Sequence, residues 1–258
     1  MRIVVCVKYV PDAAADRTFS DDHTTDRVGS TGILSELDEY AVEEALKLRE
    51  AGDAEVIVLT MGPDGAETAL KKALQMGADR AVHVSDPGLH GADAPATSLV
   101  LAAAVKKLEV DLVLCGMAST DALMGVVPAM IAERLGLPQV TLAAELTIDG
   151  GTVRIRRDGE DAVEEIEASL PAVVSVTDQI NEPRYPSFKG IMAAKKKPLE
   201  TWTLADLEIA PDQVGLGAAW TAVTEVTKRP ARTKGTVVTD DGTGAAQLAD
   251  FLAAGRFV

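Results

Sequence analysis

The first 140 residues alternate between short β-branched runs and longer segments with apolar residues at helical spacing. The short runs predict buried strands, because a strand covered on both faces is apolar throughout. Most of the longer segments are followed by glycine, which commonly ends a helix. Strands are predicted at 3–7, 55–60, 80–84 and 111–115, and helices at 38–51, 64–76, 96–108 and 125–135.

This alternation predicts an α/β fold in which a doubly wound parallel sheet carries helices on both faces. Ligands of such sheets lie beyond the carboxyl ends of the strands, near the switch in strand order. The loops after Val7, Thr60 and Cys115 are therefore the candidate binding loops.

The pattern changes after residue 144. Gly150-Gly151 separates two alternating runs and predicts a β-hairpin excursion at about 145–168. A buried strand at 170–177 is expected to return to the main sheet. Beyond Glu182 regular periodicity is largely missing until a short possible helix at 245–252. Such a tail is typical of disorder or of a segment that lies on a partner.

Composition agrees with a globular chain whose core is aliphatic. Of 258 residues, 47% are hydrophobic and only 3% aromatic, so Val, Ile, Leu and Ala must fill the interior. The net charge of -15 argues against a general nucleic-acid or anionic-membrane binder. No apolar run reaches the roughly 20 residues of a membrane helix, and the amino-terminal run is too short for a signal peptide. We therefore expect no membrane insertion and a cytoplasmic location.

Metal-binding and nucleophile motifs are missing from the sequence. Cys6 and Cys115 form no CxxC or CxxH pattern, which excludes a zinc ribbon, an ordinary iron–sulfur centre and a disulfide scaffold. His23, His83 and His90 stand apart, and His83 within an apolar strand is typical of a satisfied core residue. There is no GxSxG elbow. The residues predict no metal site and no catalytic site.

The loop after the fourth predicted strand, 116–125, is rich in small residues and carries two hydroxyl groups. Small residues let backbone N–H groups approach an anion at the start of the next helix. The loop is neither GxGxxG nor a P-loop. The alternative is structural, with Ser119 or Thr120 capping the helix. In the loop after the first strand, Asp12 could accept a ribose hydrogen bond, or it could only form a turn.

A basic segment interrupts the acidic chain at 184–197. It holds no acidic residue, and its cations surround four apolar side chains. Cations around an apolar anchor are typical of a docking loop, because charge steers encounter and the anchor supplies affinity. The alternative is a solvated loop whose apolar residues are tucked beneath it. The residues are Arg184, Tyr185, Phe188, Lys189, Ile191, Met192, Lys195, Lys196 and Lys197.

The ordered motifs of the chain resemble one family, the β subunit of electron transfer flavoprotein. The most specific motif runs from Asn-Glu-Pro-Arg-Tyr at 181–185 to Gly-Ile-Met-Ala-Ala-Lys-Lys-Lys at 190–197. A signature region is also present, from Arg-Arg-Asp-Gly at 156–159 to 170–174. The remaining motifs lie at 7–12, 38–46 and 73–80, so that the resemblance is dense over about residues 1–200.

The resemblance implies an electron carrier and not an enzyme. Members pair an α with a β subunit, hold FAD mainly on the α subunit, and carry electrons from acyl-CoA and related flavin dehydrogenases toward the respiratory chain, as in fatty acid oxidation. The β subunit has a Rossmann-like, adenine-nucleotide-binding fold and usually holds a structural AMP. Carried over by position, the nucleotide contacts are Cys6, Ser35, Glu36, Leu37, Asp38, Met61, Gly116, Ala118, Ser119, Thr120, Asp121, Met124, Gly125, Val126 and Val127.

The resemblance also divides the chain. Residues 1–182 are expected to form the α/β nucleotide-binding domain, and 183–198 the recognition loop that docks into dehydrogenases. Residues 199–258 are expected to form a C-terminal arm that packs on the α subunit. Phe188 stands where many members have an anchoring Leu, so the matching pocket on the dehydrogenase should differ.

Some positions depart from the family pattern. Apolar residues at 122–124 and 126–127 replace most polar groups of the AMP loop, which reduces the side-chain contacts available to a nucleotide. Two alternatives follow for the function. One is an electron-bifurcating relative with a second FAD in place of AMP, although its Asp-Gly-Asp-Thr pattern is missing. The other is a stand-alone adenine-nucleotide-binding regulator that resembles universal stress proteins.

Overall fold

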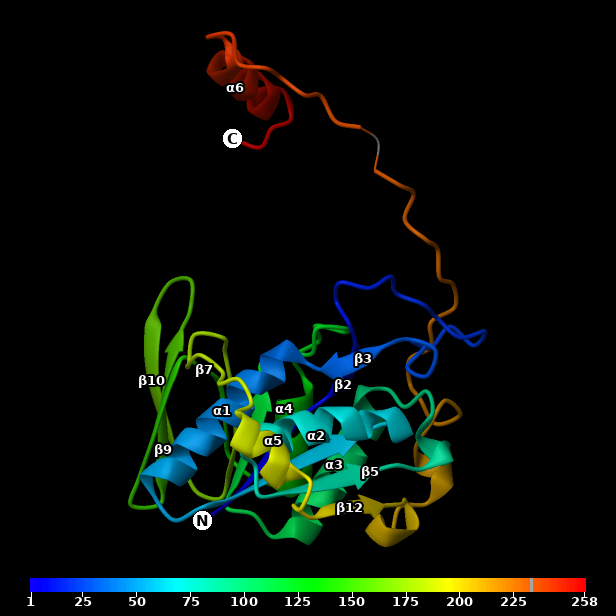
Figure 1. Ribbon diagram of the computed structural model, residues 1–258, viewed down its shortest axis with the longest axis vertical. Helices are drawn as coiled ribbons and strands as arrows, with labels where there is room; N and C mark the ends of the chain where they lie inside the picture. Colours follow the sequence, from blue (N-terminus) through cyan, green and yellow to red (C-terminus); the bar gives the residue numbers. More distant parts are fainter. Residues whose placement is uncertain (233) are drawn as a thin grey trace. The chain divides into compact units, whose positions relative to one another are not determined.

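The computed structural model describes residues 1–232 and 234–258, which divide into two compact units, 1–224 and 225–258. The first unit is built on a seven-stranded sheet with the order β12-β5-β4-β1-β6-β11-β7, and every neighbouring pair is parallel (Figure 1). The strands are β1 (Arg2–Cys6), β4 (Glu55–Met61), β5 (Arg80–Val84), β6 (Leu112–Gly116), β7 (Gln139–Ala143), β11 (Ala172–Val176) and β12 (Leu199–Trp202).

Helices cover both faces of this sheet, which confirms the doubly wound α/β prediction. Apolar residues of α1 (Glu36–Ala51) and α2 (Glu67–Met76) form one buried cluster with one face of the strands. Those of α3 (Ala94–Leu108) and α4 (Val127–Leu135) form the other cluster. Both clusters are almost wholly aliphatic, as the composition requires. The chain proceeds from β1 to β4 on one side and reaches β6 on the other, so the order switches at β1 and β6.

Local sequence fixes the ends of these helices. The Asp93 side chain caps α3 by accepting a hydrogen bond from the Ala96 N–H at 3.1 Å. Gly136 ends α4 with a φ of 64°, a conformation that glycine adopts without strain. Short 3-10 turns lie at Asp64–Ala66, Pro87–Leu89, Ala205–Leu207 and Pro211–Gln213.

A second, antiparallel sheet has the order β10-β9-β8. Its strands are β8 (Glu145–Asp149), β9 (Thr152–Asp158) and β10 (Val163–Ser169). Gly150 and Gly151 turn the first hairpin with φ angles of 54° and 83°, as the Gly-Gly motif predicts. Val153 and Ile155 pack this sheet onto the core. A ribbon of β2 (Tyr9–Pro11) and β3 (Gly32–Leu34) was not predicted.

The chain beyond residue 198 differs from the expected arm. β12 pairs with β5 along the edge of the main sheet, and Trp202, Leu204 and Val214 are buried in the core. The first unit therefore continues to Thr224, and the separate C-terminal segment begins at Glu225 rather than at residue 199. The expected boundary fails because β12 is short and half exposed, so its sequence has no strong period.

The second unit contains one helix in its described residues, α6 (Gly244–Ala254), which covers the predicted 245–252. Its apolar side chains are exposed, among them Leu248 and Phe251. The Phe251 and Phe257 rings lie with their centroids 6.1 Å apart. No helix among the described residues is long and apolar enough to cross a membrane.

Candidate functional site

The carboxyl ends of β1 and β6 meet the start of α1 at the switch point. The Lys8 N–H donates to Asp38 Oδ2 at 2.8 Å, and the Gly116 N–H also donates to this carboxyl group. Asp38 thus joins the loops that follow two neighbouring strands. Burial raises the pKa of Asp38 to about 7, although both N–H donors and the Lys8 charge oppose the rise.

Close packing at this point requires glycine at residue 116. A Cβ there would lie 2.5 Å from Asp38 Oδ1 and 2.7 Å from the Leu37 carbonyl oxygen. The first turn of α1 therefore lies directly against the end of β6. This brings residues 35–38 and the loop after β6 together, as the family resemblance implies.

An ion cluster lies beside Asp38, formed by Lys8, Arg27 and Asp121. Lys8 Nζ lies 2.8 Å from Asp121 Oδ1 and 3.2 Å from Ser119 Oγ, and Arg27 donates to Asp121 Oδ2 at 2.5 Å. The Asp121 side chain is only 2% exposed. Burial alone would raise the pKa of Asp121, but the two cations hold it well below its usual range. Asp121 neutralises one of these two cations, and Lys8 also faces the buried Asp38 carboxyl group.

The same cluster ties the segment at 12–31 to the loop after β6. Arg17 donates to the Thr120 carbonyl oxygen at 3.1 Å, and Arg27 donates to the Tyr9 carbonyl oxygen at 3.0 Å. Burial, together with the nearby Arg27 charge, lowers the pKa of Lys8 although Asp121 opposes this. Sequence reasoning did not find Arg27, because its segment has no periodic pattern. Lys8 lies in the motif after the first strand, and this position could have identified it as a site residue.

Ser35 gives the clearest sign of an unfilled role at this site. Its side chain is fully buried, yet its Oγ has no hydrogen-bond partner and does not cap α1. Buried hydroxyl groups normally have a partner.

Cys6 and Met61 end β1 and β4 at the same edge of the sheet. Cys6 and Cys115 are register partners on β1 and β6, and the neighbouring Cys6 thiol, together with burial, raises the pKa of Cys115.

The loop itself differs from the structural alternative that the sequence allowed. Ser119 and Thr120 do not cap the next helix, because α4 begins at Val127. Leu123 and Met124 are 71% and 61% exposed. Asp12, in contrast, forms a turn, and its Oδ1 accepts a hydrogen bond from the Ala14 N–H at 2.9 Å.

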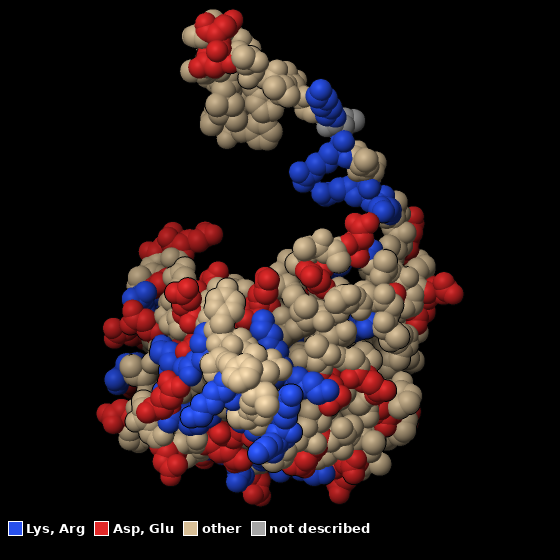
Figure 2. Space-filling model, viewed as in Figure 1, with Lys and Arg blue, Asp and Glu red and all other residues tan. Residues whose placement is uncertain are grey.

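The recognition segment, residues 183–198, contains a short helix, α5 (Phe188–Ala194), rather than a plain loop. Tyr185 and Phe188 are 95% and 80% exposed, and Ile191 and Met192 are also exposed. These four residues are called the apolar group below. Figure 2 shows tan surface over α5 bordered by blue basic side chains. The alternative in which the apolar residues lie beneath the loop is therefore wrong.

The basic residues of this segment divide by direction. Lys189, Lys195 and Lys196 are exposed around the apolar group. Arg184 instead forms ion pairs with Glu43 and Glu50 of α1. Lys197 Nζ donates to three backbone carbonyl groups at the end of α2.

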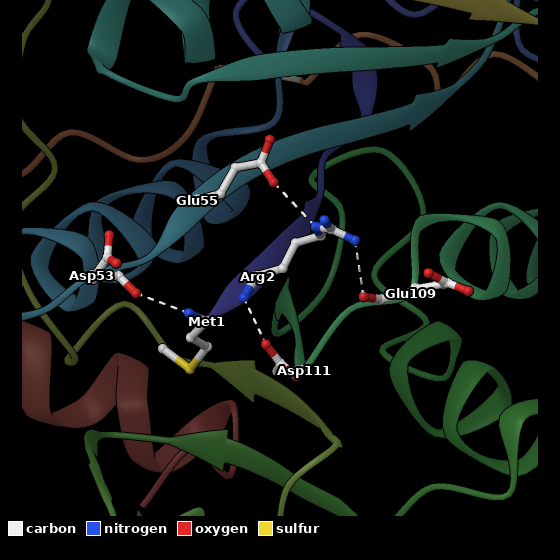
Figure 3. A pocket seen from close by; sticks show the side chains of 6 residues that line it. All are labelled: Met1, Arg2, Asp53, Glu55, Glu109 and Asp111. Carbon is white, nitrogen blue, oxygen red and sulfur yellow. Dashed lines mark hydrogen bonds and ion pairs between the residues drawn. The ribbon is translucent and has the colours of Figure 1, made fainter.

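A surface hollow at the opposite, amino end of the sheet is unlike this site (Figure 3). Its polar groups satisfy one another, since Arg2 binds Glu55 at 3.1 Å and Asp111 accepts from the Arg2 N–H at 2.7 Å. Within the described residues no group of His, Cys, Asp or Glu could hold a metal. His83 is a core residue whose Nε2 lies 3.1 Å from the Gly62 carbonyl oxygen. The hollow is lined by Met1, Arg2, Asp53, Glu55, Glu109 and Asp111.

Comparison with known proteins agrees with these features. Residues 23–207 match the family described as electron transfer flavoprotein domain. The electron transfer flavoprotein subunit beta of Mycobacterium tuberculosis is 47% identical over 99% of each chain. The subunit of the same name from Clostridium acetobutylicum is 39% identical over 92% of each chain. The caffeyl-CoA reductase-Etf complex subunit CarD of Acetobacterium woodii is 39% identical over 93% of this chain and 92% of its own. The chain therefore belongs to the electron transfer flavoprotein β-subunit family, and it is an electron carrier subunit rather than an enzyme.

Proposed function

We propose that this chain joins an α subunit to form a cytoplasmic carrier that takes electrons from acyl-CoA-type dehydrogenases, in fatty acid oxidation, and delivers them toward the respiratory chain. The observation that carries the proposal is the exposed apolar group on and beside α5. Aromatic side chains at this exposure are costly in water unless a partner covers them. In a chain with only 3% aromatic residues, two of them stand here.

The charges around the apolar group favour an acidic partner surface. Lys189, Lys195 and Lys196 are exposed on a chain of net charge -15, so they form a local basic patch. Such a patch steers encounter with carboxylates, while a buried aromatic anchor supplies most of the affinity. Phe188 is the proposed anchor, and it would fill an apolar pocket on the dehydrogenase.

The residues of the switch point fit an adenine nucleotide such as AMP. Ser35 Oγ is buried without a partner, and Lys8 and Arg27 carry one positive charge more than Asp121 neutralises. The backbone N–H groups at the start of α4 would be further donors for the phosphate. AMP would supply a structural bridge between the loops after β1 and β6, with no part in the electron transfer. The redox FAD would lie mainly on the α subunit.

The second unit is proposed to bind the α subunit. Residues 225–258 form few contacts with one another. They leave the side chains of Leu248, Phe251 and Phe257 exposed. A helix of this length is marginal in water without tertiary packing. A partner surface that covers these side chains would supply that packing.

The test is replacement of the anchor in the complex with the α subunit. Phe188→Ala should lower the rate of flavin reduction by an acyl-CoA dehydrogenase at least tenfold, since an aromatic hot spot is worth about 2 kcal/mol or more. FAD content should not change. Val163→Ala removes another exposed apolar side chain, 65% exposed on β10, and should have no effect. Equal rates for Phe188→Ala and the wild type would refute the docking role.

The nucleotide proposal has a separate test. Mass spectrometry of the denatured complex should find one FAD and one AMP per heterodimer. Two FAD and no AMP would instead indicate the electron-bifurcating alternative. A colourless homodimer formed beside the α subunit would refute the carrier assignment.

A further inference from the structure

We propose that Arg184 and Lys197 are positioning residues that hold the two ends of the docking surface, so that the apolar group is preformed before a dehydrogenase arrives. The inference rests on the docking role proposed above. Neither side chain belongs to the apolar group, and both face inward. Their contacts, and one glycine between them, carry the argument.

The amino-terminal end is held by Arg184 against α1. Its Nε lies 2.7 Å from Glu43 Oε2, its Nη2 2.8 Å from Glu43 Oε1, and its Nη1 2.5 Å from Glu50 Oε1. The Arg184 backbone N–H also donates to Glu43, whose side chain is only 8% exposed. The hydrogen bonds that Arg184 donates to Glu43, and then to Glu50, raise the pKa of Arg184. A planar guanidinium can form a bidentate pair with each of the two carboxylates at once, a geometry that an ammonium group cannot reproduce.

The carboxyl-terminal end is held by Lys197 against α2. Its Nζ donates to the carbonyl oxygens of Leu74 at 3.0 Å, Gly77 at 2.9 Å and Ala78 at 2.5 Å. The last carbonyl groups of a helix have no partner within the helix and carry partial negative charge. Lys197 therefore fills a defined role at the end of α2. This geometry uses all three of its N–H donors.

Between these ends α5 lies directly on α2. A Cβ on Gly190 would lie 2.4 Å from the Gln75 carbonyl oxygen, so the two backbones approach as closely as glycine allows. The helix α5 has only seven residues and cannot be stable alone. Its order therefore depends on tertiary contacts, among them these three with α1 and α2 and the packing of Ala194 on the core.

Such order has a consequence for association. A flexible segment must lose conformational freedom when it docks, and this loss weakens binding, whereas a preformed one has already lost it. Arg184 and Lys197 should then affect docking without touching the dehydrogenase. Their effect should also survive high salt, because it does not arise from long-range attraction.

Neighbouring lysines provide a matched pair for the test. Lys196→Met and Lys197→Met remove the same charge one residue apart, but Lys196 is exposed. In the complex with the α subunit, stopped-flow absorbance would follow flavin reduction by an acyl-CoA dehydrogenase at low and high salt. We expect Lys197→Met to lower the second-order rate roughly tenfold at both salt concentrations. The effect of Lys196→Met should shrink as salt rises. Identical salt dependence of the two variants would overturn the proposal.

The other end supplies a second variant series. Arg184→Met should lower the second-order rate as Lys197→Met does, and Arg184→Lys should restore only part of it. The limiting rate at saturating dehydrogenase and the rate of reduction by dithionite should not change, because the first is measured after docking and the second does not use the docking surface. Hydrogen exchange at residues 188–196 should become faster in both Met variants. Wild-type rates or unchanged exchange in Arg184→Met would overturn the proposal.

The outcome separates this inference from the docking role. If the dehydrogenase does not reduce the wild-type complex, or if Phe188→Ala is as fast as the wild type, the docking role itself fails. If Phe188→Ala is slow while Arg184→Met and Lys197→Met keep the wild-type rate, only the positioning role fails.

Discussion

Asp38→Asn tests the buried carboxyl group that joins β1, β6 and α1. The pKa of Asp38 rises from 3.8 in an exposed chain to about 7 in the fold, because the group is buried. Between these two values the folded chain binds more protons than the unfolded chain. Its stability must therefore fall as pH rises from about 4 through 7. Asparagine has the same shape and cannot ionise, so the variant lacks this loss.

The size of the effect follows from the two pKa values. The full difference corresponds to about 4 kcal/mol, of which about 2 kcal/mol lies between pH 5 and pH 7. For a chain of this size that is a shift in melting temperature of about 5 °C. Asparagine also places an N–H group near the Lys8 or Gly116 donor, which costs about 1 kcal/mol at every pH.

Thermal unfolding of the complex with the α subunit would measure this effect at pH 5, 6, 7 and 8. The relevant quantity is the melting temperature of Asp38→Asn minus that of the wild type, because other pH-dependent groups then cancel. We expect the variant to be less stable at pH 5 and to gain about 5 °C on the wild type by pH 7. A difference that stays constant with pH would refute the reasoning.

Three further changes test the site and the fold. Gly116→Ala should lower the free energy of unfolding by about 3 kcal/mol and abolish nucleotide retention, since its Cβ would collide with Asp38 and the Leu37 backbone. Gly217→Ala is the control: its Cβ would enter open space, and thermal unfolding should not change. Trp202→Ala should cost about 3 to 5 kcal/mol in the same assay, because this side chain is buried beneath the sheet edge. A chain that ends at Thr224 should keep the circular dichroism of the folded first unit but lose co-elution with the α subunit. Its unfolding would show that the second unit stabilises the first.

The central sheet could be predicted because its strands are covered on both faces. Largely apolar runs such as 80–84 must be buried in a folded chain. The strand predicted at 80–84 has the same bounds as β5. β12 could not be predicted, since an edge strand of four residues with Glu200 and Thr201 has no continuous apolar run. Its place in the sheet depends on pairing with β5, which lies far away in the sequence.

The sequence indicated which backbone segments meet at the candidate site, but not how the charged side chains are arranged there. The strand–helix pattern placed the loops after Val7 and Cys115 at one edge of the sheet, and only the family resemblance pointed to residues 35–38 beside them. Asp38 and Gly116 do meet there. The number of Lys and Arg residues in the recognition segment does not reveal which of their side chains are exposed and which face the fold. Lys197 faces inward because the end of α2, about 120 residues earlier, presents carbonyl groups there.

The recognition segment also has a fixed place in the order of folding. It connects β11 to β12, which lie on opposite sides of β1, and Arg184 binds residues more than 130 positions earlier in the chain. Contacts between residues so far apart in the sequence form late in folding. The chain must first lose the entropy of closing a long loop before the contact can stabilise it. We therefore expect the docking surface to be completed only after the sheet has closed. Under the proposed docking role, a half-folded chain would then lack the surface that a dehydrogenase binds.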